Sequence, residues 1–105
     1  MFRAALIAIC LAVFPAALAH AAGKTHTVTI EGMKFTPERL EVAAGDTVVW
    51  TNKDFLPHSV TASGAKVESG DLAPGKTFRF VARKKGEVSY ICRLHPVMKG
   101  VVVVK

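Results

Sequence analysis

The feature that most constrains the fold is an alternation of apolar and polar residues that repeats along most of the chain. From residue 25 onward, β-branched and aromatic residues recur at every second position, as in Thr27-Val28-Thr29-Ile30 and Thr77-Phe78-Arg79-Phe80-Val81. A period of two is that of a strand with one buried face, and no stretch sustains the 3.6-residue period of an amphipathic helix. The sequence therefore predicts an all-β protein.

The alternating segments are short, and Gly and Pro separate them. The expected strands are, in order, Thr25–Glu31, Arg39–Ala43, Thr47–Asn52, His58–Ser63, Thr77–Val81, Gly86–Cys92 and Gly100–Lys105. Residues 66–75 are expected to be loop and turn, and the four valines of the last strand are typical of a strand covered on both faces. About seven such strands, with no repeat or linker between them, predict one β-sandwich with Greek-key connections.

The N-terminal residues have the composition of a secretory signal peptide. A short positive start precedes the apolar run Ala4–Leu18, and A-x-A cleavage sites end at Ala19 and Ala21. The run is shorter than the roughly 20 apolar residues that a bilayer requires, so a membrane anchor is the less favoured reading. We expect residues 1–21 to be removed on export to the periplasm, which leaves 22–105 as the mature domain.

Size and charge limit the functions open to this domain. About 84 residues form one small domain that buries about 60–65% of its unfolded surface. Loss of Arg3 with the signal peptide takes the formal charge from +6 to about +5, and a mildly basic surface suggests an acidic partner protein. Nucleic acid is not expected as a partner, because the Lys and Arg residues are scattered and Arg83-Lys84-Lys85 is their one cluster.

Cysteine usage directs attention to one residue. Cys10 leaves with the signal peptide, so Cys92 remains alone in an oxidising compartment where disulfides normally persist. Such a cysteine forms an intermolecular bridge, lies buried without a role, or binds a metal. Its neighbours favour the metal, because His95 and Met98 follow at intervals of three residues and a further histidine, His58, stands upstream after a proline.

One thiolate, two imidazoles and one thioether form the ligand set of a blue-copper electron-transfer site. Cys92 would supply the equatorial thiolate, His58 and His95 would complete the trigonal plane, and Met98 would be the weak axial ligand. Taken singly, an exposed histidine or a methionine in the core is common. The combined pattern in an exported chain predicts that the four side chains converge on one metal ion.

Other functions fit the sequence less well. His20 and His26 have no clustered partners and are expected to be solvated. Copper enzymes such as oxidases and nitrite reductases need a second copper centre, for which the chain offers no ligands, so we do not expect an enzyme. The alternative is a copper-binding protein for delivery or detoxification without an electron-shuttle role. Such proteins commonly have Met-rich and His-rich tracts, whereas this chain has three Met.

Several motifs together resemble the cupredoxins, the type 1 blue-copper proteins. These motifs are Trp50-Thr51-Asn52, Pro57-His58, Tyr90-x-Cys92 and Cys92-x-x-His95-Pro96-x-Met98-x-Gly100. The resemblance covers Thr25–Lys105 and is nearest to amicyanin, plastocyanin and pseudoazurin, with a short ligand loop like that of amicyanin. It implies a Greek-key β-sandwich of seven to eight strands that carries one copper ion. It also implies a monomeric, soluble one-electron carrier between redox partners such as a dehydrogenase and a cytochrome.

The resemblance further implies that electrons pass through the edge of His95 inside an apolar patch. The residues expected around it are Met33, Leu56, Pro57, Pro96 and Val97, with Lys53, Arg93 and Lys99 close enough in sequence to steer an acidic partner. Two positions depart from the family pattern. Ser59 stands where many members have Asn, and Arg93-Leu94 replaces smaller or proline residues in the ligand loop.

Overall fold

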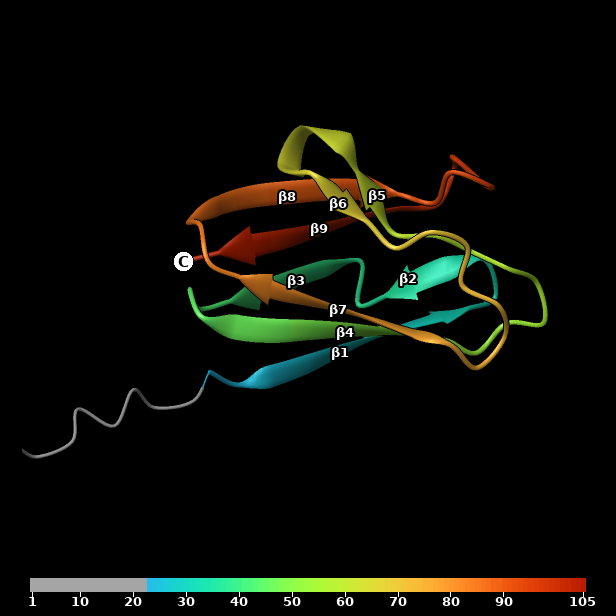
Figure 1. Ribbon diagram of the computed structural model, residues 1–105, viewed down its shortest axis with the longest axis horizontal. Coiled ribbons are helices and arrows are strands. Elements are labelled where there is room, and N and C mark those ends of the chain that lie inside the picture. The colour runs from blue at the N-terminus through green and yellow to red at the C-terminus, as the bar shows by residue number, and fades with distance from the viewer. Residues whose placement is uncertain (1–22) are drawn as a thin grey trace, which may run out of the picture.

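The computed structural model describes residues 23–105, and the expected signal peptide lies outside these residues (Figure 1). Within them the chain forms nine strands and one short 3₁₀ turn, η1 (Ser63–Ala65), and no α-helix. The strands lie in two sheets that pack face to face, so the prediction of an all-β sandwich is confirmed.

The first sheet has four strands in the order β2-β1-β4-β7. Their bounds are β1 Thr25–Glu31, β2 Lys34–Thr36, β4 Asp46–Asn52 and β7 Thr77–Ala82. β1 and β4 are neighbours in parallel orientation, which a hairpin cannot produce. The chain between them therefore crosses to the other sheet, where it forms β3, and then returns.

The second sheet has five strands in the order β3-β9-β8-β5-β6. Their bounds are β3 Arg39–Val42, β5 Thr61–Ala62, β6 Val67–Glu68, β8 Gly86–Ile91 and β9 Lys99–Val104. β9 is an interior strand here, since it pairs in parallel with β3 and antiparallel with β8. The loop between β8 and β9 is thus anchored by the strands on both of its sides.

Three short strands differ from the sequence prediction. The expected strand His58–Ser63 narrows to Thr61–Ala62, because the preceding segment bonds to the loop at Leu72 rather than to a continuous ladder. Val67–Glu68 pairs with β5 inside the stretch expected to be loop, and Lys34–Thr36 pairs with β1. Strands of two or three residues show no readable period, so pattern analysis misses them.

The valine-rich final strand is covered less completely than expected. Val102 and Val104 are buried in the core, whereas Val101 and Val103 are half-buried on the outer face. A two-layer sandwich covers only one face of each sheet, so the prediction of coverage on both faces was wrong. Neighbouring strands shield the outer pair in part.

Aromatic rings fill the space between the sheets near the start of the β8–β9 loop. Tyr90 stands edge-on to Phe35, with ring centroids 4.7 Å apart, and edge-on to Trp50 at 5.3 Å. Across the β8–β9 ladder Tyr90 faces Gly100, and a Cβ atom at Gly100 would overlap the tyrosine ring. Gly100 is therefore required by the packing of Tyr90.

We predict that Gly100→Ala destabilises the domain by about 1–3 kcal/mol, since the added methyl group must displace a buried ring. Urea unfolding followed by fluorescence measures this change. Gly64→Ala is the matched control, because a Cβ atom there meets nothing within 4 Å. Equal stabilities for the two variants would contradict this account of the core.

His26 is not solvated as the sequence suggested. It lies in β1, and its Nε2 is 2.9 Å from Oδ2 of the buried Asp46. Asp46 also accepts N–H groups from Lys24 and Ala43. The bond from His26 and the N–H of Ala43 hold the pKa of Asp46 below its ordinary value.

We predict that this carboxylate makes stability pH-dependent. A lowered folded-state pKa stabilises the fold above the unfolded-state pKa of about 3.9, and this contribution is lost as the pH falls through the folded-state pKa. Asp46→Asn should therefore be less stable than the parent at pH 7 and should lose less stability between pH 5 and pH 2. Urea unfolding across this range measures both. Glu31→Gln, which removes an exposed acid from the neighbouring strand β1, serves as control. If Asp46→Asn lost as much stability between pH 5 and pH 2 as the parent, the assignment to Asp46 would be refuted.

Candidate metal centre

The three-residue spacing of Cys92, His95 and Met98 corresponds to two consecutive turns. The N–H of His95 donates to the carbonyl of Cys92 at 3.2 Å, and the N–H of Met98 donates to the carbonyl of His95 at 2.9 Å. The N–H of Cys92 in turn donates to the carbonyl of Met98 at 3.1 Å and closes the loop. Each turn brings the next side chain back toward the first, so the spacing itself folds the loop around one point.

The segment with His58 comes from the other side of the site, after β4. Its path is held by the fully buried Asn52, whose side-chain amide donates to the carbonyls of Leu56 and Leu72 at 2.9 and 2.8 Å. His58 itself exchanges two backbone hydrogen bonds with Leu72. These bonds satisfy buried polar groups in a segment that has no regular ladder, and they fix the position of the histidine.

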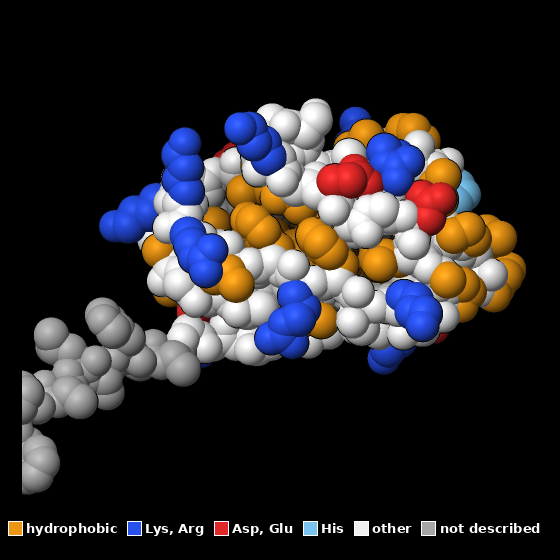
Figure 2. All heavy atoms as spheres, viewed as in Figure 1, with side chains coloured by type: hydrophobic (Ala, Val, Ile, Leu, Met, Phe, Trp, Pro, Cys, Tyr) orange, Lys and Arg blue, Asp and Glu red, His pale blue; other side chains and the backbone are white. Residues whose placement is uncertain are grey.

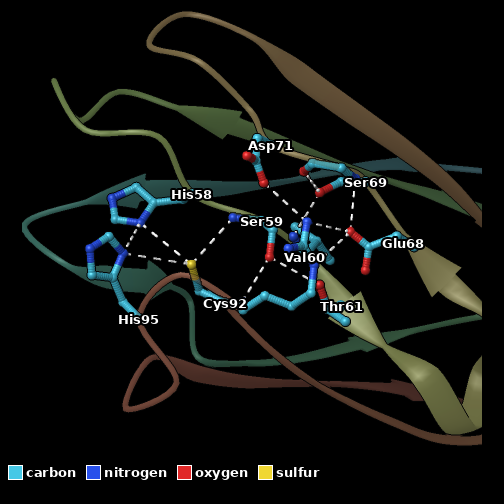
Figure 3. Close-up of polar contacts among 11 residues, drawn as sticks. His58, Ser59, Val60, Thr61, Glu68, Ser69, Asp71, Cys92 and His95 are labelled. Carbon is cyan, nitrogen blue, oxygen red and sulfur yellow. Dashed lines mark hydrogen bonds and ion pairs between the residues drawn. The ribbon is translucent and has the colours of Figure 1, made fainter.

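Three donor atoms converge between these segments (Figure 3). The Cys92 Sγ is 3.7 Å from Nδ1 of His58 and 3.8 Å from Nδ1 of His95, and the two nitrogens are 3.2 Å apart. A point equidistant from three atoms so arranged lies about 2.1 Å from each, near the usual metal–imidazole distance of about 2.0–2.1 Å and the metal–thiolate distance of about 2.3 Å. The triangle of donor atoms thus has the size to hold one metal ion.

A carboxylate orients the buried His58. Oδ2 of Asp54 is 2.8 Å from Nε2 of this histidine, so Nε2 carries the proton and the lone pair of Nδ1 faces Cys92. Desolvation raises the pKa of Asp54, but the N–H groups of Gly32 and Met33 together with the His58 ring outweigh it and lower that pKa below its ordinary value. Asp54 is therefore ionised and strengthens the donor character of the histidine.

Ser59 and Arg93 join the two halves of the site. The backbone N–H of Ser59 points at the Cys92 Sγ at 3.3 Å, and its hydroxyl accepts the N–H of Arg93 at 2.8 Å. The Arg93 guanidinium, on the exposed side, binds Glu68 and Asp71 at 3.0 Å each. The serine thus braces the ligand loop through its own short side chain, and the arginine ties the loop to β6 and to the segment that follows it.

The structure brings the donor atoms of three of the four predicted ligands together. The fourth, Met98, is buried in the same loop as Cys92 and His95. His58 and Cys92 are fully buried, His95 is half-buried, and Met98 is 3% exposed within the closed loop. Sequence analysis missed Asp54. An acidic residue four positions before a candidate ligand histidine was the available signal, although such a pair is common on surfaces without any role.

Known proteins with a similar sequence or fold agree with a metal centre at this place. Residues 3–104 match the family model described as a cupredoxin-like domain. The chain belongs to the cupredoxin family. Amicyanin-alpha of Methylorubrum extorquens is 37% identical to this cupredoxin over 98% of the present chain and 99% of its own length.

Solved structures extend the match to three dimensions. The Cu(I) form of an amicyanin mutant is 30% identical, covers 83% of this chain and 88% of its own, and superposes with a TM-score of 0.75. The copper-containing nitrite reductase of Thermus scotoductus superposes with a TM-score of 0.72 at 30% identity, over 77% of this chain. This cupredoxin spans only 22% of that enzyme's chain.

We predict that Asp54→Asn lowers the affinity of this cupredoxin for Cu(II) about 10- to 100-fold, because the neutral amide no longer polarises His58. Competition with a chelator of known affinity measures the change. Asp71→Asn removes a nearby charge that contacts neither histidine and should keep affinity within about threefold. Equal losses in the two variants would show that only local charge matters.

Proposed function

We propose that this cupredoxin binds one copper ion through His58, Cys92, His95 and Met98 and serves as a one-electron carrier between proteins. The convergence of one thiol sulfur and two imidazole nitrogens on a single point carries the proposal. Sulfur and imidazole donors in a trigonal plane suit copper, which when bound supplies a one-electron change between Cu(I) and Cu(II). The family and its copper-containing structural neighbours support the same conclusion.

Each ligand has a distinct part in this proposal. Cys92, as a thiolate, would give the strongest bond; its burial keeps water from the sulfur, and the Ser59 N–H donates to it. His58 is locked by Asp54, so its ring does not need to reorient when the charge at the site changes. Met98, held in the closed loop, offers a soft thioether that tunes the reduction potential.

His95 is the proposed point of entry and exit for electrons. It is the least buried of the ligand residues, and large apolar side chains at the same end of the molecule are exposed. Figure 2 shows these side chains gathered at the end of the molecule where a histidine reaches the surface. The exposed large apolar residues in the segments that carry or contact the proposed ligands are Met33, Phe55, Leu56, Leu94 and Val97. Phe55 and Leu94 add to the patch that the sequence predicted, and a small apolar patch suits transient docking.

Charges around this patch differ from the sequence expectation. Arg93 is paired with Glu68 and Asp71, so much of its charge is offset. Lys53 and Lys99 form no ion pair in the described part of the chain, and we assign to them the steering of an acidic partner.

The proposed setting is the periplasm, after removal of residues 1–21, with 22–105 as a monomeric domain. A dehydrogenase and a cytochrome are the proposed donor and acceptor classes, with no role for nucleic acid. Among the residues that the structure describes, no helix has the length and apolarity needed to cross a membrane. A carrier rather than an enzyme is proposed, because residues 23–105 contain one group of metal-ligating side chains, His58, Cys92 and His95.

The visible absorption spectrum of the mature protein with one equivalent of Cu(II) tests the proposal. We expect an intense blue thiolate-to-copper band that ascorbate bleaches and that reappears on reoxidation. Cys92→Ala should abolish the band because the thiolate is lost, and His58→Ala should shift or weaken it.

His26→Ala is the matched control and should keep the band, since this histidine contacts Asp46 and none of the proposed ligands. A pale spectrum with copper still bound would instead favour copper delivery or detoxification. No binding of copper would overturn the proposed site.

A further inference from the structure

A cluster of unpaired positive charge lies far from the proposed copper ligands. Arg83, Lys84 and Lys85 form the turn between β7 and β8, and Lys66 follows η1. All four are exposed, and none takes part in an ion pair of the described residues. Figure 1 shows that the β7–β8 turn lies at the end of the sandwich opposite the β8–β9 loop. The apolar patch around His95 does not include this cluster.

The cluster borders a groove of about 650 Å³ between β7, β8 and η1, which we call the β7–β8 groove. Its large apolar residues are Phe80 and Val88, both half-buried, and Val81, which is 37% exposed. Figure 2 shows apolar side chains in a hollow of this face with Lys and Arg side chains around it. Glu87 is the one acidic residue among those lining the groove. The groove therefore combines an apolar floor with a positive rim.

Two strand edges are open along the β7–β8 groove. Among the strands of residues 23–105, β7 is the outermost of its sheet and pairs only with β4. β8 pairs with β5 at a single position, Ile91, so Gly86–Tyr90 has β9 on one side and no strand of the described chain on the other. In an antiparallel strand, alternate residues turn their N–H and C=O groups away from the partner. These groups are available for pairing with another chain.

We propose that the β7–β8 groove binds an extended, acidic segment of a protein partner as an added strand. Side chains of an added strand alternate, so acidic residues would meet the Lys and Arg rim while apolar residues would contact Phe80 and Val88. A second copy of this chain is disfavoured as the occupant, because its own Arg83-Lys84-Lys85 cluster would be repelled. A flat anionic membrane is disfavoured because it cannot enter a groove or pair with backbone groups. The inference goes beyond electron transfer and requires no bound metal.

The test uses a fluorescent octapeptide that alternates Glu with Val, titrated with the mature, copper-treated protein and followed by anisotropy. We expect saturable binding that weakens as salt rises. Lys84→Glu combined with Lys85→Glu should weaken binding about five- to tenfold or more, since two exposed attractions become repulsions. Amide shifts in NMR spectra of the labelled protein should map to Val81 and Gly86–Ser89.

Three controls make the outcome decisive. The first control is the double variant Lys24→Glu with Lys34→Glu, which changes the net charge by the same amount. Lys34 lies in β2, at the edge of the four-stranded sheet opposite β7, so this variant should keep the affinity for the peptide within about twofold. A peptide with Pro at its centre should bind far more weakly, because it cannot complete the strand pairing. Thermal unfolding checks that every variant is folded.

Several results would overturn the inference. Equal weakening by both double variants would mean that net charge alone attracts the peptide. Undiminished binding of the Pro peptide would exclude strand addition. Binding to anionic phosphatidylglycerol vesicles but not to the peptide would assign the cluster to lipid. Absence of all binding would leave Lys84 and Lys85 as protection of an edge strand against aggregation.

Discussion

The contact between the buried Cys92 sulfur and the segment that carries His58 joins the two sheets at the functional end of the molecule. Cys92 directly follows β8 of one sheet, and His58 lies on the connection that leaves β4 of the other. The Ser59 N–H and the His58 ring both point at the sulfur, so the ends of both sheets are positioned against one atom. The half-buried His95 then approaches from a loop whose two ends are fixed by paired strands. Any shift of one sheet relative to the other would open the triangle of donor atoms.

Rigidity at this end has a chemical consequence. The loop with His58 contains no ladder, yet the side chains of Asn52 and Asp54 pair with its backbone groups and with the His58 ring. A site whose donor atoms are already aligned needs little rearrangement when the charge on a bound ion changes by one. The ionised Asp54 adds a negative charge on the far side of the His58 ring, which favours the more positive state of a bound metal. The hydrogen bonds of Asn52 and Asp54 therefore fix both the position of His58 and the charge beside it.

Charge is distributed unevenly over the surface. Near the ligand loop, Arg93 is committed to Glu68 and Asp71, so apolar side chains dominate that end. At the other end, Arg83-Lys84-Lys85 has no acidic partner in the described chain and borders open strand edges. The molecule thus has one end suited to brief apolar contact, with Lys53 and Lys99 as its unpaired positive charges among the described residues, and another end where a denser positive cluster borders open strand edges. The formal net charge of +6 does not by itself reveal this division.

Much of the fold was predictable because alternation along a strand is a local property. The longer strands, such as Thr25–Glu31 and Thr77–Ala82, follow from residues that are neighbours in sequence, and the two turns from Cys92 to Met98 follow from a fixed spacing. The two- and three-residue strands were not predictable, since they form only where an established strand offers an edge.

Sequence alone determined the class of the fold and the chemical identity of the candidate ligands. A two-residue period has one structural meaning, and only a few metals accept a thiolate, two imidazoles and a thioether. Tertiary structure decided what surrounds them. The pairing of Asp54 with His58, of Asp46 with His26 and of Arg93 with Glu68 depends on how separate segments meet. The open edge of β8 likewise depends on β5 being too short to cover it. Such contacts join residues with no shared local pattern, so only the folded chain brings them within hydrogen-bonding distance.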